Sequence, residues 1–519
     1  MSLRSRQSQK HVIVGNETAL ELHRNGLYTP DREAEALVEP LRRACCLTHT
    51  ELQGADAAEN PGVVDRRLQQ ALAESLAAPI RLDEHAPEQA LMSRFAVRCA
   101  VHSAQRTWSD IMARTTFINA RIFDGSQAEY LEESVVVVEG NRIAEVGRQL
   151  PASNAGEVLD VRGCTLMPGL IDAHCHVLGS SVKIAEVETQ PLTYVAQHGA
   201  RMLSHALDCG FTTIRDVGGG EIGIAQAVEH GLIRGPRVLF AGRAMSMTGG
   251  HGDFRDPVSS AGACSCCAEG RVSVIVDSKD AMRAAVREEL RRGAHCIKLM
   301  MSGGVLSPSD PLWMDQFSDE EVLVAVEETA RRRKYVAAHC HPAASIARAA
   351  RLGVRSIEHA TLIDAGSAEA VKSAGAFVVP TLVIVSALLD SAKTGGLPEW
   401  AAEKLRVVSE HSLRGLEMMD RMGLKIGFGT DLLGKLHVHQ TREFLLRREV
   451  QSPLAILRAA TSTNAELLGE ATLGRIQAGN EADILIVEGD PLKDIGLLAS
   501  DGRTLRVIMK AGVFYKRPA

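Results

Sequence analysis

Two histidines separated by one residue follow an apolar run, and they are the first side chains in the sequence with clear metal chemistry. The segment reads Pro168-Gly-Leu-Ile-Asp-Ala-His-Cys-His176. On a β-strand, side chains at positions i and i+2 point to the same face, so the imidazoles of His174 and His176 can reach one point. Because imidazole nitrogen is a common zinc ligand, this spacing predicts a chelating pair for a metal ion.

Four more residues with ligand or acid–base side chains stand in or just after apolar runs of their own: Lys298, His339, His359 and Asp431. Each has an ordinary alternative, such as a hydrogen-bonded core histidine or, for Asp431, a helix N-cap. Their shared position at the ends of apolar runs favours a single site. His341 follows His339 by two residues and shares its strand face, so periodicity leaves both open as the ligand.

Lys298 lies in the otherwise apolar segment Cys296-Ile-Lys-Leu-Met-Met301. A lysine that extends its amine to the end of the strand is one interpretation. The other follows from burial, which lowers the pKa of an amine, because the neutral amine can add CO2 to give a carbamate. A carbamate is an anion with two oxygens, so it can bridge two metal ions.

The middle of the chain, about residues 168–469, alternates strand-like and helical stretches. Glycines mark the predicted helix ends, where a left-handed conformation is favoured: Gly210, Gly293, Gly353, Gly375 and Gly423. Eight strands are predicted, ending near His176, Asp216, Gly242, Met301, His341, His359, Leu382 and Asp431. This alternation predicts an α/β fold, a (β/α)8 TIM barrel, whose chemistry lies at the C-terminal ends of the strands.

The segments on either side of the middle contain short alternating strands. Residues 112–167 include the hairpin signal Gly140-Asn141, and residues 470–519 show the same pattern. Neither segment can bury a core alone, so we predict a small flanking β-sandwich built from both. Residues 1–111 contain no motif and form an N-terminal extension that we expect to be disordered or dispensable. A chain that begins at Met112 should keep full activity.

The composition gives no sign of a nucleic-acid or membrane partner. The chain of 519 residues is 45% hydrophobic and 24% charged, with a net charge of -6 and no basic tract. It contains no apolar run of about 18 residues, so we expect no membrane span. A small molecule or short peptide is the expected substrate.

The cysteines favour a reducing compartment. There are eleven, an odd number, and Cys175, Cys296 and Cys340 adjoin the candidate ligands, where disulfides would distort the site. The cluster formed by Cys264, Cys266 and Cys267 has no second Cys or His pair at zinc-finger spacing, so free thiols are expected. With no apolar signal region at the N-terminus, we expect a cytoplasmic protein.

The combined pattern resembles the amidohydrolase superfamily over residues 112–519: His-x-His after strand 1, Lys after strand 4, His after strands 5 and 6, and Asp after strand 8. Four segments resemble the imidazolonepropionase-like branch, which includes Xaa-Pro dipeptidases, arginine/lysine carboxypeptidases and ochratoxinase. They are Gly210-Phe-Thr-Thr-Ile-Arg-Asp-Val217, Thr248-Gly-Gly-His-Gly-Asp253, Ile297-Lys-Leu-Met-Met-Ser-Gly-Gly-Val305 and Gln316-Phe-Ser318.

This resemblance implies two divalent metal ions, with zinc expected from the nitrogen and oxygen ligands. The implied ligands of the more buried ion are His174, His176 and Asp431. The second ion would be bound by His339 and His359, and carbamylated Lys298 would bridge the two. The resemblance thus favours His339 over His341.

A metal-bridging hydroxide would then attack an amide carbonyl, and Asp431 would carry its proton to the leaving nitrogen. His251 is a candidate for binding the substrate carbonyl or carboxylate, and the backbone of Ser302, Gly303 and Gly304 for lining the pocket. We expect His437 and His439, just beyond Asp431, to be exposed.

The substrate class implied by the resemblance is dipeptides or N-acyl amino acids, and a homo-oligomer is expected. One alternative is hydrolysis of a cyclic amide, such as an imidazolone or lactam, or of an ochratoxin-type amide. Mononuclear deaminases of the superfamily do not need the strand-4 lysine, so Lys298 speaks against deamination. A scaffold without catalysis is disfavoured because all six ligand positions are filled.

Overall fold

The computed structural model describes residues 114–517, with gaps at 133, 150–155, 256–270 and 394–395. The extension predicted for residues 1–111 and the cluster around Cys264 lie outside the described residues. Within the described ranges, no helix is both long and apolar enough to cross a membrane.

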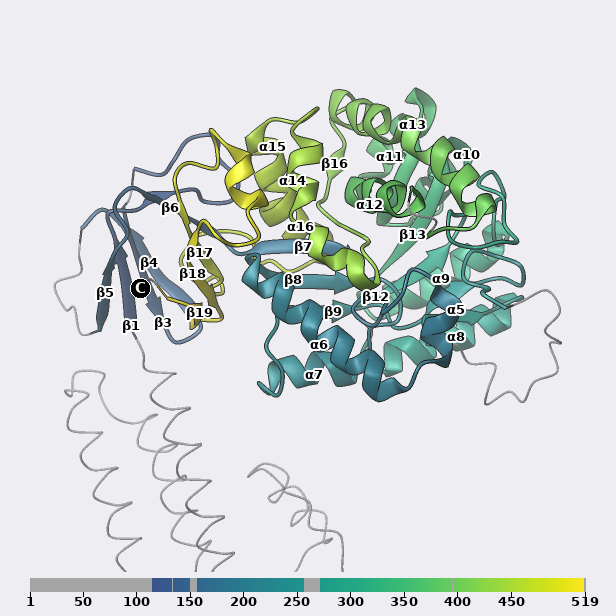
Figure 1. Ribbon diagram of the computed structural model, residues 1–519, viewed down its shortest axis with the longest axis horizontal. Coiled ribbons are helices and arrows are strands. Elements are labelled where there is room, and N and C mark those ends of the chain that lie inside the picture. The colour runs from purple at the N-terminus through teal and green to yellow at the C-terminus, as the bar shows by residue number, and fades with distance from the viewer. Residues whose placement is uncertain (1–113, 133, 150–155, 256–270, 394–395, 518–519) are drawn as a thin grey trace, which may run out of the picture. The chain divides into compact units, whose positions relative to one another are not determined.

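Two sheets flank the middle of the chain, and the second of them combines strands from both ends of the described chain (Figure 1). The first has the order β4-β3-β1-β5, with β1 Arg114–Ile118, β3 Val135–Glu139, β4 Arg142–Gly147 and β5 Glu157–Asp160. The second has the order β19-β18-β17-β6-β2, with β2 Arg121–Ile122, β6 Cys164–Pro168, β17 Ile484–Glu488, β18 Leu505–Lys510 and β19 Val513–Lys516. Buried side chains of both sheets, such as Phe117, Val136, Ile484 and Val507, form one hydrophobic cluster. The predicted hairpin at Gly140 joins β3 to β4.

The middle of the chain forms parallel strands that the structure divides between two sheets, with no single closed sheet among the described residues. One contains β7 Leu170–Cys175, β8 Phe211–Asp216 and β9 Arg237–Phe240. The other contains β10 Ala244–Ser246, β11 Ser273–Ile275, β12 Cys296–Met300, β13 Tyr335–Pro342, β14 Ser356–Leu362, β15 Phe377–Val379 and β16 Lys425–Ile426.

Backbone hydrogen bonds join these two sheets at both ends. On one side His295 N donates to Phe240 O at 2.7 Å, which ties the start of β12 to β9. On the other side Ala173 N donates to Phe428 O at 2.8 Å, which ties β7 to the segment after β16. The parallel strands are therefore connected as in a TIM-barrel-type α/β fold.

Helices follow the strands and surround them (Figure 1). They are α5 Ile184–Thr189, α6 Leu192–Asp208, α7 Ile222–Glu229, α8 Lys279–Arg291, α9 Asp319–Arg331, α10 Ala343–Arg351, α11 Ala365–Ala374, α12 Leu382–Ala392, α13 Glu399–Arg421, α14 Arg442–Arg447, α15 Pro453–Arg458 and α16 Asn464–Leu468. The predicted capping box of Ser318 with Glu321 begins α9. The five predicted helix-ending glycines all have positive φ, from 65° at Gly375 to 95° at Gly293.

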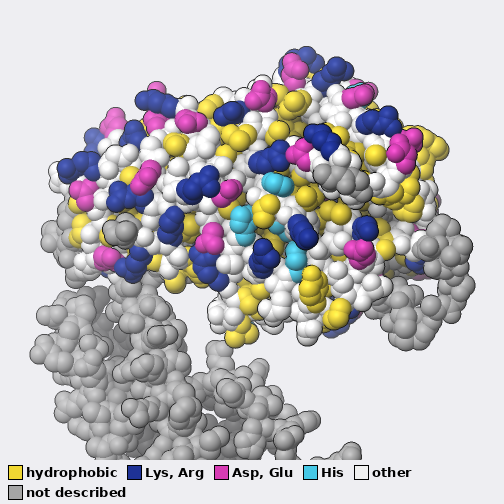
Figure 2. All heavy atoms as spheres, viewed as in Figure 1, with side chains coloured by type: hydrophobic (Ala, Val, Ile, Leu, Met, Phe, Trp, Pro, Cys, Tyr) yellow, Lys and Arg dark blue, Asp and Glu magenta, His cyan; other side chains and the backbone are white. Residues whose placement is uncertain are grey.

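The described surface mixes charges of both signs. Figure 2 shows Lys and Arg side chains interspersed with Asp and Glu side chains over one face, with hydrophobic side chains between them. This face therefore offers no extended basic area of the kind that contacts a phosphate backbone.

Candidate metal centre

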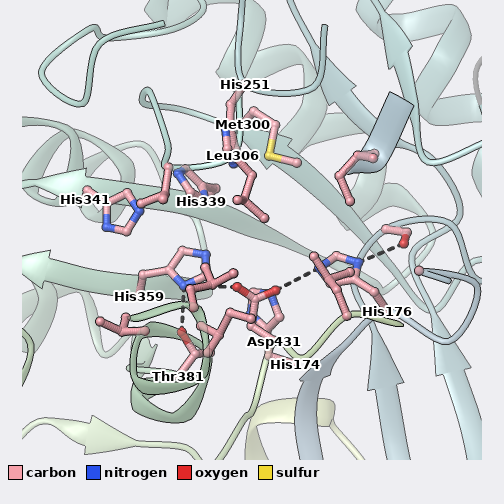
Figure 3. A pocket seen from close by; sticks show the side chains of 18 of the residues that line it. His174, His176, His251, Met300, Leu306, His339, His341, His359, Thr381 and Asp431 are labelled. Atoms are coloured by element: carbon pink, nitrogen blue, oxygen red, sulfur yellow. Dashed lines mark hydrogen bonds and ion pairs between the residues drawn. The ribbon is translucent and has the colours of Figure 1, made fainter. Parts of the chain in front are cut away.

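Six histidines and one aspartate, all labelled in Figure 3, line a single cavity at the C-terminal ends of the parallel strands. One lysine lines the same cavity. Together these residues are His174, His176, His251, Lys298, His339, His341, His359 and Asp431. All six ligand positions predicted from the sequence are among them. Residues separated by up to 257 positions therefore meet in one cavity.

Asp431 lies between imidazoles from two strands. Its Oδ1 is 3.3 Å from His174 Nε2 and 3.1 Å from His176 Nε2, and its Oδ2 is 4.0 Å from His359 Nδ1. Ligand atoms of His174, His359 and Asp431 all lie within 4.8 Å of one another, as one bound cation would require.

His339 and His341 project from β13 beside His359. The ring centroid of His359 is 4.7 Å from that of His339 and 5.1 Å from that of His341. His339 Nε2 bonds to Gly303 O at 3.2 Å, whereas His341 Nδ1 bonds to Thr361 Oγ1 at 3.1 Å. Both imidazoles are within reach of the same cavity.

Burial and mutual repulsion keep these imidazoles neutral. The pKa values of His339 and His359 are well below the usual range, first because of burial and then because of neighbouring histidines. Burial alone would raise the pKa of the Asp431 carboxyl, but His174 and His176 hold it well below its usual range. The neutral imidazoles of His339 and His359 and the ionised carboxylate of Asp431 have the protonation states that bind a divalent cation.

Lys298 is 2% exposed and lines the same cavity. Burial lowers the pKa of its amine, although Glu358 and Asp431 partly oppose this. No other described residue forms a hydrogen bond or ion pair with the amine. A buried amine without a partner fits the expectation that this nitrogen has another chemical form in the working protein.

Three residues of the site have the left-handed backbone conformation that glycine favours. The φ angles are 68° at His359, 56° at Asp431 and 47° at Thr381. Thr381 Oγ1 is also 2.7 Å from His359 Nδ1. Strained backbone of this kind concentrates at functional sites, where the surrounding structure holds it in place.

Buried groups outside the cavity contact the candidate ligands. His174 Nδ1 is 2.7 Å from Glu358 Oε2, and Glu358 is paired in turn with Arg215. His176 Nδ1 lies 2.9 Å from Gly218 O. Asp172 accepts a hydrogen bond from Thr430 Oγ1 at 2.6 Å and so fixes the residue before Asp431.

Ser307 and Asp310, which are not candidate metal ligands, hold the imidazole of His251 at its Nδ1. Its Nδ1 is 2.6 Å from Ser307 Oγ and 3.3 Å from the buried carboxylate of Asp310. Its ring lies 4.2 Å from that of His339, measured between centroids. Lys404 of α13 donates to the carbonyls of Gly304, Ser307 and Asp310, which fixes the loop beneath His251.

Ser302, Gly303 and Gly304 are not among the described residues that line the cavity, and they contact the histidines instead. Ser302 Oγ accepts a hydrogen bond from His341 N at 3.0 Å. A Cβ at Gly304 would overlap the His251 ring.

Sequence reasoning did not single out Glu358, Arg215, Thr381, Asp310 or Lys404. The signal for the first two was a charged residue inside an apolar strand; the others show no local signal. The expectation that His437 is exposed was wrong, because it is 6% exposed. The turn after Asp431 packs near His198, and the ring centroids of His198 and His437 are 6.1 Å apart.

The profile of the Amidohydrolase family matches residues 165–513. The chain belongs to this family. It is 32% identical to ochratoxinase from Aspergillus niger over 430 residues, which are 78% of this chain and 88% of that protein. The resemblance noted in the sequence is thereby confirmed.

Solved structures of similar enzymes support the same family. A prolidase in complex with N-methylphosphonate-L-proline is 40% identical, with a TM-score of 0.76, and the match covers 78% of this chain and 100% of the prolidase. A Xaa-Pro dipeptidase with bound methionine is 28% identical, with a TM-score of 0.70, over 78% of this chain and 100% of its own. The protein is an amidohydrolase, an enzyme that hydrolyses amide bonds, and the superfamily generally uses divalent metals.

Proposed function

We propose that the protein is a binuclear metal-dependent amidohydrolase that cleaves the amide bond of dipeptides or N-acyl amino acids. The side chains that would hold the two cations are His174, His176, Lys298, His339, His359 and Asp431. Nitrogen and carboxylate ligands with hydrolytic chemistry suit zinc. The observation that carries the proposal is the buried amine of Lys298, which has no hydrogen-bond or ion-pair partner among the described residues and lies in the same cavity as the imidazoles and Asp431.

An unpaired lysine amine is costly to bury, so its presence at this position needs a chemical reason. Because burial lowers the pKa of Lys298, its neutral form can add CO2. The resulting carbamate would place an anion with two oxygens among His174, His359 and Asp431. The donor set would then offer two anionic groups and four imidazoles to two divalent cations.

Two divalent cations at this site would supply an activated water and polarise the substrate carbonyl. A side chain of the protein would transfer the proton. Asp431 would accept it from the attacking water and deliver it to the leaving nitrogen, which leaves poorly unless protonated. His251, on the far side of His339, would hydrogen-bond the substrate carbonyl or carboxylate.

The rest of the cavity wall supports an apolar substrate. It is lined by Ile184, Phe254, Val272, Val305, Leu306, Ile384, Val385, Leu388, Leu405, Val408 and Leu433. Asp431 is the single acidic side chain among the described lining residues. An apolar acyl group or side chain therefore fits this wall better than a charged one, because a buried ammonium would have no second carboxylate to pair with. The ochratoxinase and prolidase relatives support the N-acyl amino acid and dipeptide classes respectively.

The finer architecture belongs to the same proposal. We infer that the parallel strands close into a (β/α)8 barrel spanning 168–469, supported by the hydrogen bonds that bridge its two sheets. A β-sandwich from 112–167 and 470–519 is supported by the hydrophobic cluster that its two sheets share. A dispensable segment 1–111 agrees with the match that covers 78% of this chain and 100% of the prolidase. The five described cysteines are all free, which favours a cytoplasmic location. Assembly into a homo-oligomer stays a prediction.

Replacing Lys298 tests the metal bridge. Lys298→Ala should abolish turnover and reduce the metal content below two ions per chain. Lys510→Ala is the matched control, because Lys510 is also buried but donates to Gly235 O at 2.6 Å, outside the cavity. Metal-free protein kept without CO2 should regain activity with zinc only after bicarbonate is added. Full turnover and two metals in Lys298→Ala would exclude the bridge.

A substrate panel separates the proposed class from its alternative. Xaa-Pro dipeptides and N-acyl amino acids should be cleaved, with the highest kcat/KM for apolar N-acyl substrates, and an ochratoxin-type amide is included to test that alternative. Imidazolones and lactams should be poor substrates. Turnover confined to the cyclic amides would replace the proposed substrate class with the alternative one.

A further inference from the structure

Three buried side chains in a row end at His174. Glu358 of β14 places Oε2 2.7 Å from His174 Nδ1 and Oε1 2.8 Å from Arg215 Nη2. None of these three side chains is more than 1% exposed. The Arg215–Glu358 ion pair thus contacts a candidate metal ligand from the side away from the cavity.

The two oxygens of Glu358 have separate partners. Oε1 accepts hydrogen bonds from Arg215 and from Ser356 Oγ, so Oε2 is directed at His174. A carboxylate can only accept, and therefore His174 carries its proton on Nδ1 and keeps the lone pair on Nε2. That Nε2 is the atom that lies 3.3 Å from Asp431 Oδ1, on the cavity side.

Arg215 also fixes the backbone that carries the ligand. Its Nε donates to the carbonyl of Ala173, the residue before His174. Since Arg215 belongs to β8, a single guanidinium connects β7, β8 and β14. The position of the His174 backbone and the orientation of its ring therefore depend on the same ion pair.

Packing alone does not explain these charges. Burying an ion pair costs desolvation energy that its attraction often fails to recover, and apolar side chains of similar volume frequently serve stability as well. A histidine that binds a metal, in contrast, commonly needs an acceptor for its second nitrogen to set the tautomer and the ring orientation.

We propose that Glu358 is a positioning residue that holds the ring and tautomer of His174 for metal binding, and that Arg215 holds Glu358 in turn. This inference rests on the metal centre proposed above, and neither side chain is placed in contact with substrate.

Glu358→Gln tests the inference, because glutamine has one acceptor oxygen for the two donors Arg215 and His174. Zinc affinity, measured by competition with a chromophoric chelator, should fall about 10- to 100-fold. The absorption spectrum of the cobalt-substituted protein should change as well, since it reports the geometry of the ligands. Zinc affinity within about twofold of the parent protein would overturn the proposal.

Glu443→Gln is the matched control. Glu443 forms an equally buried ion pair with Arg447, at 2.7 Å with both side chains 0% exposed, and neither residue lines the cavity. Both variants should lose thermal stability, but Glu443→Gln should bind zinc as the parent does. An equal loss of zinc affinity in both would show a general structural effect and refute a positioning role.

The double variant Arg215→Met with Glu358→Met covers the case in which Glu358→Gln fails to fold. It removes both charges and leaves none unpaired, so folding should be retained. Zinc affinity should still fall about 10- to 100-fold, and parent-like affinity would refute the proposal. If the parent protein itself binds no metal, the proposed function fails. If the parent binds zinc and the variants bind it with the same affinity, the proposed function stands and this inference alone fails.

Discussion

Replacing Asp310 by asparagine should damage turnover while leaving the fold intact. The Asp310 side chain is fully buried, its Oδ2 accepts from Gly304 N at 2.9 Å, and it lies 3.3 Å from His251 Nδ1. The substitution keeps the volume and removes the charge. Lys404 still donates to three backbone carbonyls of this loop, so the loop should keep its shape.

The expected magnitude follows from the contact that is lost. A hydrogen bond to a charged group contributes about 1.5–3 kcal/mol, and each 1.36 kcal/mol corresponds to about tenfold in rate. If that energy holds His251 where the substrate needs it, kcat/KM should fall about 10- to 150-fold in Asp310→Asn. A loss in kcat would indicate that His251 acts in the transition state, and a rise in KM alone would indicate uniform binding.

The assay is steady-state hydrolysis of an apolar N-acyl amino acid by zinc-loaded protein, with zinc content and thermal unfolding measured on the same samples. Asp483→Asn is the control, because Asp483 is also buried and ion-paired, to Arg237 at 3.0 Å, at a distance from the cavity. It should lose stability and keep kcat/KM. A change in kcat/KM of less than about threefold in Asp310→Asn, with metal retained, would refute the assigned positioning of His251.

Two further substitutions give distinct readouts. Gly304→Ala should lower kcat/KM at least about tenfold with little loss of stability, because its Cβ would displace the His251 ring. The control is Gly366→Ala, in the open first turn of α11, which should keep activity. Burial lowers the pKa of His295 to about 4, and Lys334 adds to the effect. The unfolded chain therefore binds the proton first, so stability should decline as the pH falls from about 6.5 to 4. Urea unfolding midpoints between pH 8 and 4 should show this decline, and His295→Asn, which cannot titrate, should show less of it.

Much of the architecture could be predicted because its signals are local. A helix-ending glycine, the capping box at Ser318 and the hairpin at Gly140 each depend on a few neighbouring residues. The ends of most apolar runs located the strand ends as well, and with them the residues that line the cavity, but the predicted strand end at Asp431 lies five residues beyond the end of β16 at Ile426. Periodicity could not choose between His339 and His341, since both project from β13 into that cavity.

The supporting contacts could not be predicted, because they join residues far apart in sequence. Arg215 and Glu358 are separated by 143 positions, and no local pattern pairs them. The burial of His437 depends on how the turn after Asp431 packs, which the mixed apolar and polar sequence of that segment does not indicate. Tertiary packing decides such features, whereas hydrophobic patterning only identifies the elements.

The strand β16 ends at Ile426, five residues before Asp431, the candidate ligand that follows it in the sequence. Beyond it the chain leaves regular strand geometry, and the backbone N–H groups of Thr430 and Asp431 both donate to His174 O. Asp431 is thus held in its left-handed conformation by the backbone of the very histidine it faces. The same histidine is tied through Glu358 to β14, the strand that carries His359. His174 is therefore linked both to Asp431 and to the strand of His359, so a disturbance at His174 should reach these two candidate ligands.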